Sequence, residues 1–269
     1  MWMKPPVIFT MLWLSIATAA EPVALRHAHA HNDYEHTRPL LDALAAGFTS
    51  VEADVHWIGG ELRVAHDEAN ALPGRTLRTL YLEPLQNLIR TNGNRVHRQR
   101  PEFFLMLDYK ASGDTAVTEL HHAVTNELFL YREMLSGVQN SKLIPGPVTI
   151  VLSGSRPATV IAAEQTRWWA IDGQLPDLTN SAPAHLVPWI STSWRPTFTW
   201  TGRDAFPAEE RNRLHDLVTQ AHAAGRRLRF WGGPDHVEFW RGLRAEGVDL
   251  INTDQLAQLA AFLSMTKEP

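Results

Sequence analysis

Polar and apolar residues alternate along two stretches near the start of the chain. In residues 50–57, Val51, Ala53 and Val55 alternate with polar or charged side chains, and residues 24–31 carry three histidines at alternate positions. Successive side chains of a β-strand point to opposite faces, so each stretch predicts a strand with one polar face. We expect the two polar faces to meet in one site, while the apolar face of the second strand packs against helices.

Strand-like and helix-like stretches then alternate through the rest of the chain. The expected strands cover residues 24–31, 50–57, 103–110, 148–153, 168–171, 186–191, 227–231 and 248–252, with a short return strand at 61–65. The expected helices cover residues 39–46, 80–90, 115–127 with a second helix to 135, 157–165, 207–224, 236–246 and 254–262. Eight strands with helices between most of them, in roughly 250 residues, predict an α/β fold, a single (β/α)8 TIM-type barrel. The alternative is an open, doubly wound sheet.

The first 20 residues differ in composition from the rest of the chain. They hold one lysine, then an apolar run over residues 7–16, then small residues that end in Ala19-Ala20. This layout is typical of a secretory signal peptide, and the run is shorter than the ~20 residues of a membrane-spanning helix. We expect residues 1–20 to be a cleaved signal peptide and residues 21–269 to be one exported domain, periplasmic or secreted. An uncleaved anchor is the alternative.

Composition excludes several classes of function. The net charge of −4 gives no basic surface for nucleic acid, and 44% hydrophobic residues are enough for a core. The chain has no cysteine, which excludes disulfides, thiol catalysis and thiolate zinc sites. Two short basic clusters, residues 95–100 and 226–229, are expected on solvated faces. Five histidines are also assigned to the surface: His97, His121, His122, His215 and His222.

Titratable residues concentrate around the first two expected strands. His27, His29 and His31 would share one strand face, and Glu52 and Asp54 would share a face of the next strand. Burying so many of these groups costs several kcal/mol unless their charges are balanced, and a bound cation is the simplest balance. Barrel enzymes build their sites at the carboxyl ends of the strands. Six candidates fall at such ends: His29, His31, Glu52, Asp54, Asp108 and Trp231.

Several common catalytic motifs are absent from the sequence. It contains no G-x-S-x-G, H-E-x-x-H, G-x-x-x-x-G-K or G-x-G-x-x-G segment. The serine hydrolase, zincin and nucleotide-loop interpretations therefore lose their main support. Histidines and carboxylates carry the functional interpretation instead.

The sequence resembles the superfamily of PLC-like phosphodiesterases, which includes phosphatidylinositol-specific phospholipase C and glycerophosphodiester phosphodiesterase. The resemblance is carried by residues 29–34 (HAHNDY), 50–55 (SVEADV), 66–67 (HD), 106–110 (MLDYK), 229–231 (RFW) and 248–254 (VDLINTD). Within the superfamily, the combination of HAHNDY, SVEADV and RFWG-PD is most similar to the branch of altered inheritance of mitochondria protein six. The chain departs from the glycerophosphodiesterases in two places, where His31-Asn32-Asp33 replaces their H-R-G and Asp108 replaces their third-strand Glu.

The resemblance implies a role for each histidine of the site. His31 and His66 would be the acid–base pair, and imidazole suits both roles because it titrates near neutrality. His29 has no assigned role; it would orient Glu52, contact the substrate, or itself be the acid–base residue. In most relatives the nucleophile is a neighbouring hydroxyl of the substrate, which gives a cyclic phosphate first.

The resemblance also implies a cation and a set of substrate contacts. One divalent cation, Ca²⁺ or Mg²⁺, would be held by oxygen ligands and would clamp the phosphate. Its ligands would be Glu52, Asp54 and Asp108, with Asn32 as the fourth. Lys110 would neutralise the phosphate, and Arg156 and Trp231 are further candidate substrate contacts.

Together these features predict an enzyme, a metal-dependent phosphoric diester hydrolase of the phospholipase C type. Its substrate would be a glycerophosphodiester, a phospholipid head group or a similar small phosphodiester. A phospholipid would bring transient contact with a membrane surface, and the oligomeric state stays open. Two alternatives also stay open. His29-x-His31 resembles the H-x-H of amidohydrolase and phosphoesterase barrels, and a non-catalytic binding module would keep the same barrel.

Overall fold

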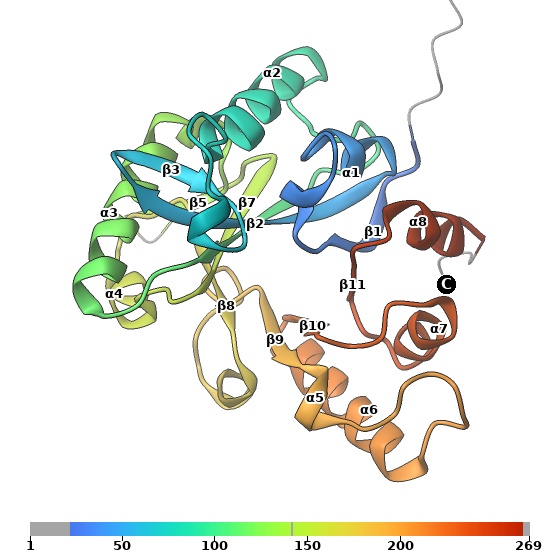
Figure 1. The fold of residues 1–269 in the computed structure, drawn as a ribbon. Coiled ribbons are helices and arrows are strands. Elements are labelled where there is room, and N and C mark those ends of the chain that lie inside the picture. The colour runs from blue at the N-terminus through green and yellow to red at the C-terminus, as the bar shows by residue number, and fades with distance from the viewer. Residues whose placement is uncertain (1–21, 141, 266–269) are drawn as a thin grey trace, which may run out of the picture.

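A computed structural model of the protein describes residues 22–140 and 142–265. Among them, eight parallel strands form the barrel: β1 (Leu25–Ala30), β2 (Phe48–Ile58), β4 (Phe103–Tyr109), β7 (Val148–Gly154), β8 (Ala170–Gly173), β9 (Trp189–Ser193), β10 (Arg227–Trp231) and β11 (Leu250–Thr253). β1 pairs with both β2 and β11, which closes the sheet (Figure 1). The closed sheet confirms the predicted (β/α)8 barrel and shows that the doubly wound alternative is wrong.

Helices surround the closed sheet, as Figure 1 shows. They are α1 (Leu41–Ala45), α2 (Glu83–Thr91), α3 (Asp114–Leu130), α4 (Ala158–Ala163), α5 (Trp194–Thr197), α6 (Ala208–Ala223), α7 (Val237–Ala245) and α8 (Leu256–Met265). The ends of α6 follow from the sequence, because Pro207 precedes its first residue and Gly225, with a φ of 68°, follows its last turn. Among the described residues, none of these helices combines the length and the apolar character needed to cross a membrane.

Some short elements differ from the sequence-based expectations. An antiparallel hairpin of β5 (Gly137–Gln139) and β6 (Lys142–Ile144) was not predicted, because its strands are short and mostly exposed. The expected second helix before residue 135 is a single turn over Arg132–Met134. The predicted signal peptide, residues 1–20, lies outside the described residues, so its cleavage and the export of the protein stay predictions.

The barrel interior has an apolar lower level. Phe104 and Met106 of β4 cluster there with Val151, Ala170, Trp189 and Leu250, whereas the residues between them on β4 join the larger outer core under the helices. Asp108 follows Met106 by two positions and therefore lies on the same inward face, one level higher. The polar residues of the site thus stand on an apolar floor at the carboxyl ends of the strands.

The end of β2 forms a hairpin that carries His66 to the barrel mouth. The last residues of β2 pair antiparallel with β3 (Glu61–Val64) through a turn at Gly59 and Gly60, whose φ values are 60° and 82°. Glycine adopts such positive φ values without steric cost. The Ala65 amide then donates to the Asp54 carbonyl oxygen at 3.3 Å, which fixes His66 above the second strand.

Several residues expected on the surface are buried. Arg226 and Arg229 of the second basic cluster are each 2% exposed, and His97 and His121 are 4% and 5% exposed. Each has hydrogen-bond partners, which is the condition under which a polar side chain can be buried. Arg226 donates to backbone oxygens of the loop before β9, and His121 lies between Tyr109 and a carboxylate. The assignment of these residues to solvated faces is therefore wrong.

His27 does not lie with His29 among the polar residues at the carboxyl ends of the strands. Its Nδ1 is 2.7 Å from the Asp249 carbonyl oxygen and 3.2 Å from Arg244 Nη1, at the amino end of the barrel. The pairing of β1 with β2 is irregular just before His29, so the strict alternation assumed from the sequence does not hold there. Burial and the charge of Arg244 lower the pKa of His27 to about 4.

This lowered pKa predicts a pH-dependent loss of stability. Between pH 6.5 and about 4 the unfolded histidine gains a proton that the folded one does not, so the free energy of unfolding falls as the pH drops. Over this pH range, the free energy of unfolding of a His27→Gln variant should fall by roughly 1–3 kcal/mol less than that of the parent, as measured by urea denaturation. His215→Gln, on an exposed side chain of α6, is the control. Parallel pH profiles for the parent and His27→Gln would contradict the prediction.

Candidate active site

A cavity of about 390 Å³ opens at the carboxyl ends of the barrel strands. Eight predicted site residues line it: His31, Asn32, Glu52, His66, Asp108, Lys110, Arg156 and Trp231. Its other lining residues are Met106, Ser153, Gly154, Asp172, Gln174, Ser191 and Arg229. The two remaining predicted residues, His29 and Asp54, are buried behind this wall and contact Glu52 and Lys110. The structure therefore brings all the predicted site residues together.

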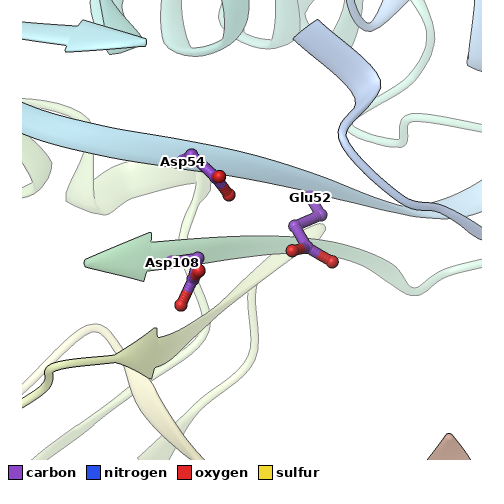
Figure 2. A group of neighbouring side chains, drawn as sticks. All are labelled: Glu52, Asp54 and Asp108. Carbon is purple, nitrogen blue, oxygen red and sulfur yellow. The ribbon is translucent and has the colours of Figure 1, made fainter. Parts of the chain in front are cut away.

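Three carboxylates form the acidic part of the site. Figure 2 shows Glu52 and Asp54 on β2 and Asp108 on the neighbouring β4, with their carboxylates close together. Asp54 and Asp108 are direct partners in the strand register, and one oxygen from each of the three groups lies within 4.8 Å of the others. Glu52 and Asp54 are buried and Asp108 is half-buried. Such a group needs positive charge nearby to remain ionised.

Arg229 supplies positive charge to Glu52. Its Nη2 donates to Glu52 Oε2 at 2.6 Å, and its Nε donates to Asn252 Oδ1 at 2.9 Å. Burial alone would raise the pKa of Glu52, but the Arg229 guanidinium and the hydrogen bond from His29 outweigh it and hold the pKa at about 2. Glu52 is therefore an anion with one oxygen already engaged.

Lys110 bridges the other two carboxylates. Its Nζ is 2.6 Å from Asp108 Oδ2 and 2.9 Å from Asp54 Oδ2. Burial would lower the pKa of Lys110, but these two contacts outweigh it, so the pKa is raised and the ammonium keeps its charge. Burial, followed by the charge of Glu52, raises the pKa of Asp54. Lys110 is thus the cation that keeps Asp54 and Asp108 together.

His31 and His66 each have one ring nitrogen held by a carboxylate. His31 Nδ1 is 2.7 Å from Asp254 Oδ1, and His66 Nδ1 is 3.1 Å from Asp54 Oδ2. Burial pulls the pKa of His31 down, but the hydrogen bond with Asp254 and the charge of Glu52 outweigh it, so the pKa is raised. With Nδ1 fixed in both rings, Nε2 is the nitrogen available for proton transfer.

His29 has no access to the cavity. It is fully buried; its Nδ1 lies 2.7 Å from Ser50 Oγ and its Nε2 lies 3.2 Å from Glu52 Oε2. Burial, together with the charge of Arg229, lowers its pKa to about 4, so the ring is neutral near neutral pH. Of the roles left open by the sequence, orientation of Glu52 fits this position. Since both of its nitrogens have partners, His29 and His31 do not form the chelating pair of an H-x-H metal site.

The loop after β1 is held by the residues of the HAHNDY segment. Asn32 lies in the left-handed region with a φ of 45°, which asparagine tolerates better than most residues. Asp33 is buried and accepts from the Leu40 amide at 2.5 Å and from Tyr81 Oη at 2.9 Å, and burial raises its pKa to about 6. Tyr34 Oη lies 2.9 Å from Asn32 Oδ1 and 2.8 Å from Asp54 Oδ2. The loop therefore ties Asn32 to the carboxylate cluster.

Sequence reasoning missed several residues of the site. Arg229, Asp254 and Tyr34 contact the predicted residues directly, and Ser153, Asp172, Gln174 and Ser191 extend the cavity wall. A signal for Arg229 existed, because a charged residue in the middle of an apolar strand requires a buried partner. Asp254 follows the last expected strand and falls at the predicted carboxyl end of the barrel.

The carboxylate cluster fits a divalent cation. Ca²⁺ and Mg²⁺ prefer carboxylate and carbonyl oxygens, which Glu52, Asp54, Asp108 and Asn32 all offer. Asp54 Oδ1 is a buried oxygen with no hydrogen-bond partner among the described residues, so it has a lone pair to give. Lys110 Nζ occupies the space beside Asp54 and Asp108, so entry of a cation would require this flexible side chain to move.

A (β/α)8 barrel with two carboxylate-held histidines, three carboxylates and a lysine at its carboxyl end is the arrangement that the resemblance to the PLC-like phosphodiesterases implies. Residues 17–171 match the model of a protein family described as the AIM6-like phosphodiesterase domain. The chain belongs to this family. The match confirms the resemblance that the HAHNDY and SVEADV segments carry.

Curated relatives agree with the family assignment. The altered inheritance of mitochondria protein 6 homolog of Arthroderma benhamiae is 30% identical over 256 residues, which are 85% of this chain and 81% of the relative. Altered inheritance of mitochondria protein 6 of Eremothecium gossypii is 27% identical over 275 residues, covering 88% of this chain and 69% of the relative. The similarity therefore extends over most of both chains.

Solved structures share the fold at low sequence identity. A phosphodiesterase from Oleispira antarctica, in complex with the product sn-glycerol-3-phosphate, superposes with a TM-score of 0.52 at 15% identity and covers 89% of this chain and 97% of that chain. A glycerophosphodiester phosphodiesterase from Parabacteroides distasonis gives 0.50 at 14% identity, covering 90% and 98%. These similarities support the barrel fold.

A substitution at Gly154 tests how tightly the cavity wall is packed around Asp108. Its φ is 63°, and a Cβ there would collide with Asp108 Oδ1 and with the Tyr109 backbone. Gly154→Ala should therefore cost both backbone strain and overpacking, about 2–5 kcal/mol of unfolding free energy. Gly93, with a φ of 67° and no atom within 4 Å of such a Cβ, is the matched control. Gly93→Ala should cost only the strain, about 1–2 kcal/mol. Equal losses of unfolding free energy for the two variants, measured by urea denaturation, would show that the cavity wall is not close-packed around Asp108.

Proposed function

We propose that the protein is a divalent-cation-dependent phosphodiesterase that cleaves a small phosphodiester by general acid–base catalysis. The observation that carries the proposal is the pair of rings on one cavity: His31 and His66 both line it, and a carboxylate holds the Nδ1 of each. Phosphodiester cleavage needs one group to remove a proton and another to supply one. The two Nε2 atoms meet this need, and membership of the phosphodiesterase family supports the same chemistry.

The proposed reaction assigns one proton transfer to each ring. His31 accepts the proton of the attacking hydroxyl while the new P–O bond forms, and His66 donates a proton to the leaving oxygen as its P–O bond breaks. We take the attacking group to be a neighbouring hydroxyl of the substrate, so the first product is a cyclic phosphate. The rings exchange roles when water opens that phosphate. Asp254 and Asp54 orient the rings and stabilise their protonated forms.

The carboxylate cluster is the proposed cation site. Glu52, Asp54, Asp108 and Asn32 would hold Ca²⁺ or Mg²⁺, which supplies positive charge to the phosphate oxygens. Arg229 and His29 both contact Glu52 Oε2 and keep this carboxylate in place. Lys110, on a flexible stem at the cavity wall, is placed to neutralise the phosphate once it leaves its carboxylate partners.

We propose a small phosphodiester as the substrate, of the glycerophosphodiester or phospholipid head-group type. The product bound to the Oleispira antarctica phosphodiesterase supports a glycerophosphate-like ligand. Arg156 and Trp231 lie on the cavity wall as candidate contacts, and Trp231 is 47% exposed at the rim. A phospholipid substrate would add transient contact with a membrane surface. On the basis of the predicted signal peptide, we propose that the reaction takes place in the periplasm or outside the cell.

Cation binding can be measured without turnover. Adding Mg²⁺ or Ca²⁺ at about 100 times its Kd to chelator-treated protein should raise the unfolding free energy by about 2.7 kcal/mol. Asp108→Asn should abolish most of this gain, whereas Asp67→Asn, on an exposed residue beside His66, should keep it. Calorimetric titration gives the Kd for each protein. Full phosphodiesterase activity in excess chelator, without calorimetric binding, would show that no cation is required.

Two substrates with different leaving groups separate the roles of the histidines. On an alkyl phosphodiester, His66→Ala should lose roughly 10²–10⁴-fold in kcat/KM, the usual effect of a general acid. On an aryl phosphodiester, whose leaving group needs no proton, the loss should shrink sharply. His31→Ala should be slow on both substrates, and His122→Ala on α3 should be unaffected. The pH profile of the parent should be bell-shaped, with limbs that belong to the coupled pair. Equal losses for His66→Ala on both substrates would mean that the roles are assigned wrongly.

A further inference from the structure

A second cavity lies at the amino end of the barrel, opposite the proposed active site. It has a volume of about 460 Å³ and is lined by the start of β1, the segment before β4 and the last turns of α7 and α8. Among the described residues, it shares none of its lining with the cavity at the carboxyl ends of the strands. The proposed reaction therefore makes no use of it.

The polar side chains of this cavity are cationic or neutral. They belong to Arg26, His27, Gln99, Arg100, Arg244 and Ser264. Within residues 22–140 and 142–265, no aspartate or glutamate lines the cavity. The Asp249 carboxylate, whose charge acts on His27, is engaged elsewhere: its Oδ2 accepts from the Leu228 amide at 2.9 Å and lies 2.8 Å from His222 Nε2. Like charges gathered in one cavity repel each other, so an anion bound among them would be stabilised.

His27 shows how these cations act on a group inside the cavity. Its Nδ1 lies 2.7 Å from the Asp249 carbonyl oxygen, which can only accept, so Nδ1 carries a proton. Arg244 Nη1 lies 3.2 Å from the same nitrogen. Burial and the charge of Arg244 lower the pKa of His27 to about 4, with a smaller contribution from Arg26 and opposition from Asp249. An anion placed among these groups would offset the two guanidinium charges and raise that pKa.

The three guanidinium groups are suited to hold an anion. Each carries five N–H donors in a planar fork that matches two oxygens of a carboxylate or phosphate. Arg26 is exposed, whereas Arg100 and Arg244 are half-buried and also interact with other groups of the chain. Because five donors allow several partners at once, such interactions leave a guanidinium able to bind a ligand as well.

The size and the apolar wall of the cavity indicate the rest of the ligand. Leu25 and Leu263 are each 8% exposed, and Val23 lies at the rim with 66% exposure. A volume of about 460 Å³ falls within the range of small-molecule sites and exceeds what a phosphate or carboxylate group alone fills. Apolar side chains beside the cations would bury an apolar portion of the ligand.

We propose that this cavity binds a small organic oxyanion, a carboxylate or phosphate group carried on an apolar body. Arg26, Arg100 and Arg244 hold the charged oxygens, and Leu25 and Leu263 contact the body. The inference goes beyond the proposed phosphodiesterase function and does not depend on it, because the two cavities lie at opposite ends of the barrel and have separate linings.

NMR of the His27 ring in the full protein observes this site directly, and His27→Gln identifies the resonance by removing it. The probes are hexyl phosphate and hexanoate, which carry the two kinds of charged group on the same alkyl chain. The comparison compounds are 1-hexanol, which lacks the charge, and inorganic phosphate, which lacks the chain. At pH 7, at least one charged probe should shift the His27 signal saturably, and the tighter of the two identifies the charged group. Its Kd should be about tenfold or more below those of both comparison compounds. With hexyl phosphate bound, the pKa of His27 should rise from about 4 toward 6.5.

Two variants separate ligand binding from stability. Since Arg26 is exposed, Arg26→Gln should keep the unfolding free energy of the parent, while the Kd of the tighter probe rises about fivefold to tenfold. Arg244→Gln should weaken binding as well. Without ligand it should also raise the pKa of His27, because it removes a charge that lowers this pKa. Arg90→Gln, on an exposed residue of α2, is the matched control and should change neither the Kd nor the pKa of His27.

Several results would overturn the inference. Failure of both charged probes to shift the His27 signal, or a shift that Arg26→Gln leaves unchanged, would show that no anion binds in this cavity. Binding of 1-hexanol as tightly as the charged probes would show an apolar site only. Equal Kd values for inorganic phosphate and hexyl phosphate would overturn the apolar body of the ligand. Hexyl phosphate bound only at the active site should leave the His27 resonance in place, so this site and the proposed function can fail independently.

Discussion

The balance of charge inside the barrel mouth is the constraint on which the rest of the site depends. Glu52 and Asp54 are almost inaccessible to solvent, and unpaired carboxylates at such positions would take up protons or destabilise the fold. The ion pair of Glu52 with Arg229 joins strands β2 and β10 across the barrel, over 177 residues of sequence. Lys110 likewise forms ion pairs with Asp54 of β2 and Asp108 of the neighbouring β4. The positions of the histidines are set relative to these pairs.

Each pair is held in place by local features of the chain. The Gly59-Gly60 turn and the return strand β3 bring His66 back over Asp54, and the loop after β1 places Tyr34 on the same carboxylate. Asp54 Oδ2 consequently contacts a histidine, a tyrosine and a lysine, whereas Oδ1 has no hydrogen-bond partner within residues 22–140 and 142–265. A single carboxylate thus orients the His66 ring and, in the proposed function, would present one oxygen to the cation.

The parts of the site that the sequence predicts are those fixed by short-range periodicity. Alternation along residues 50–55 puts Glu52 and Asp54 on one face, and parallel pairing places Asp108 beside Asp54. Contacts between distant segments did not follow from composition: the charge of Arg229 within an expected strand indicated a buried partner, but it did not indicate that this partner is Glu52 of β2. The irregular pairing of β1 removed His27 from the expected face, because an irregularity changes which residues oppose each other. The roles of the histidines came from resemblance, which periodicity alone does not provide.

The charges of the three carboxylates and their two cationic partners also suit the proposed cation and substrate. Glu52, Asp54 and Asp108 face two permanent cations, Arg229 and Lys110, so these five groups together carry a net charge of one negative unit. The proposed divalent cation would reverse that charge to one positive unit, and a phosphodiester monoanion would then bring it to zero. Because uncompensated charge is costly in a partly buried cavity, each of these two ligands would make binding of the other more favourable.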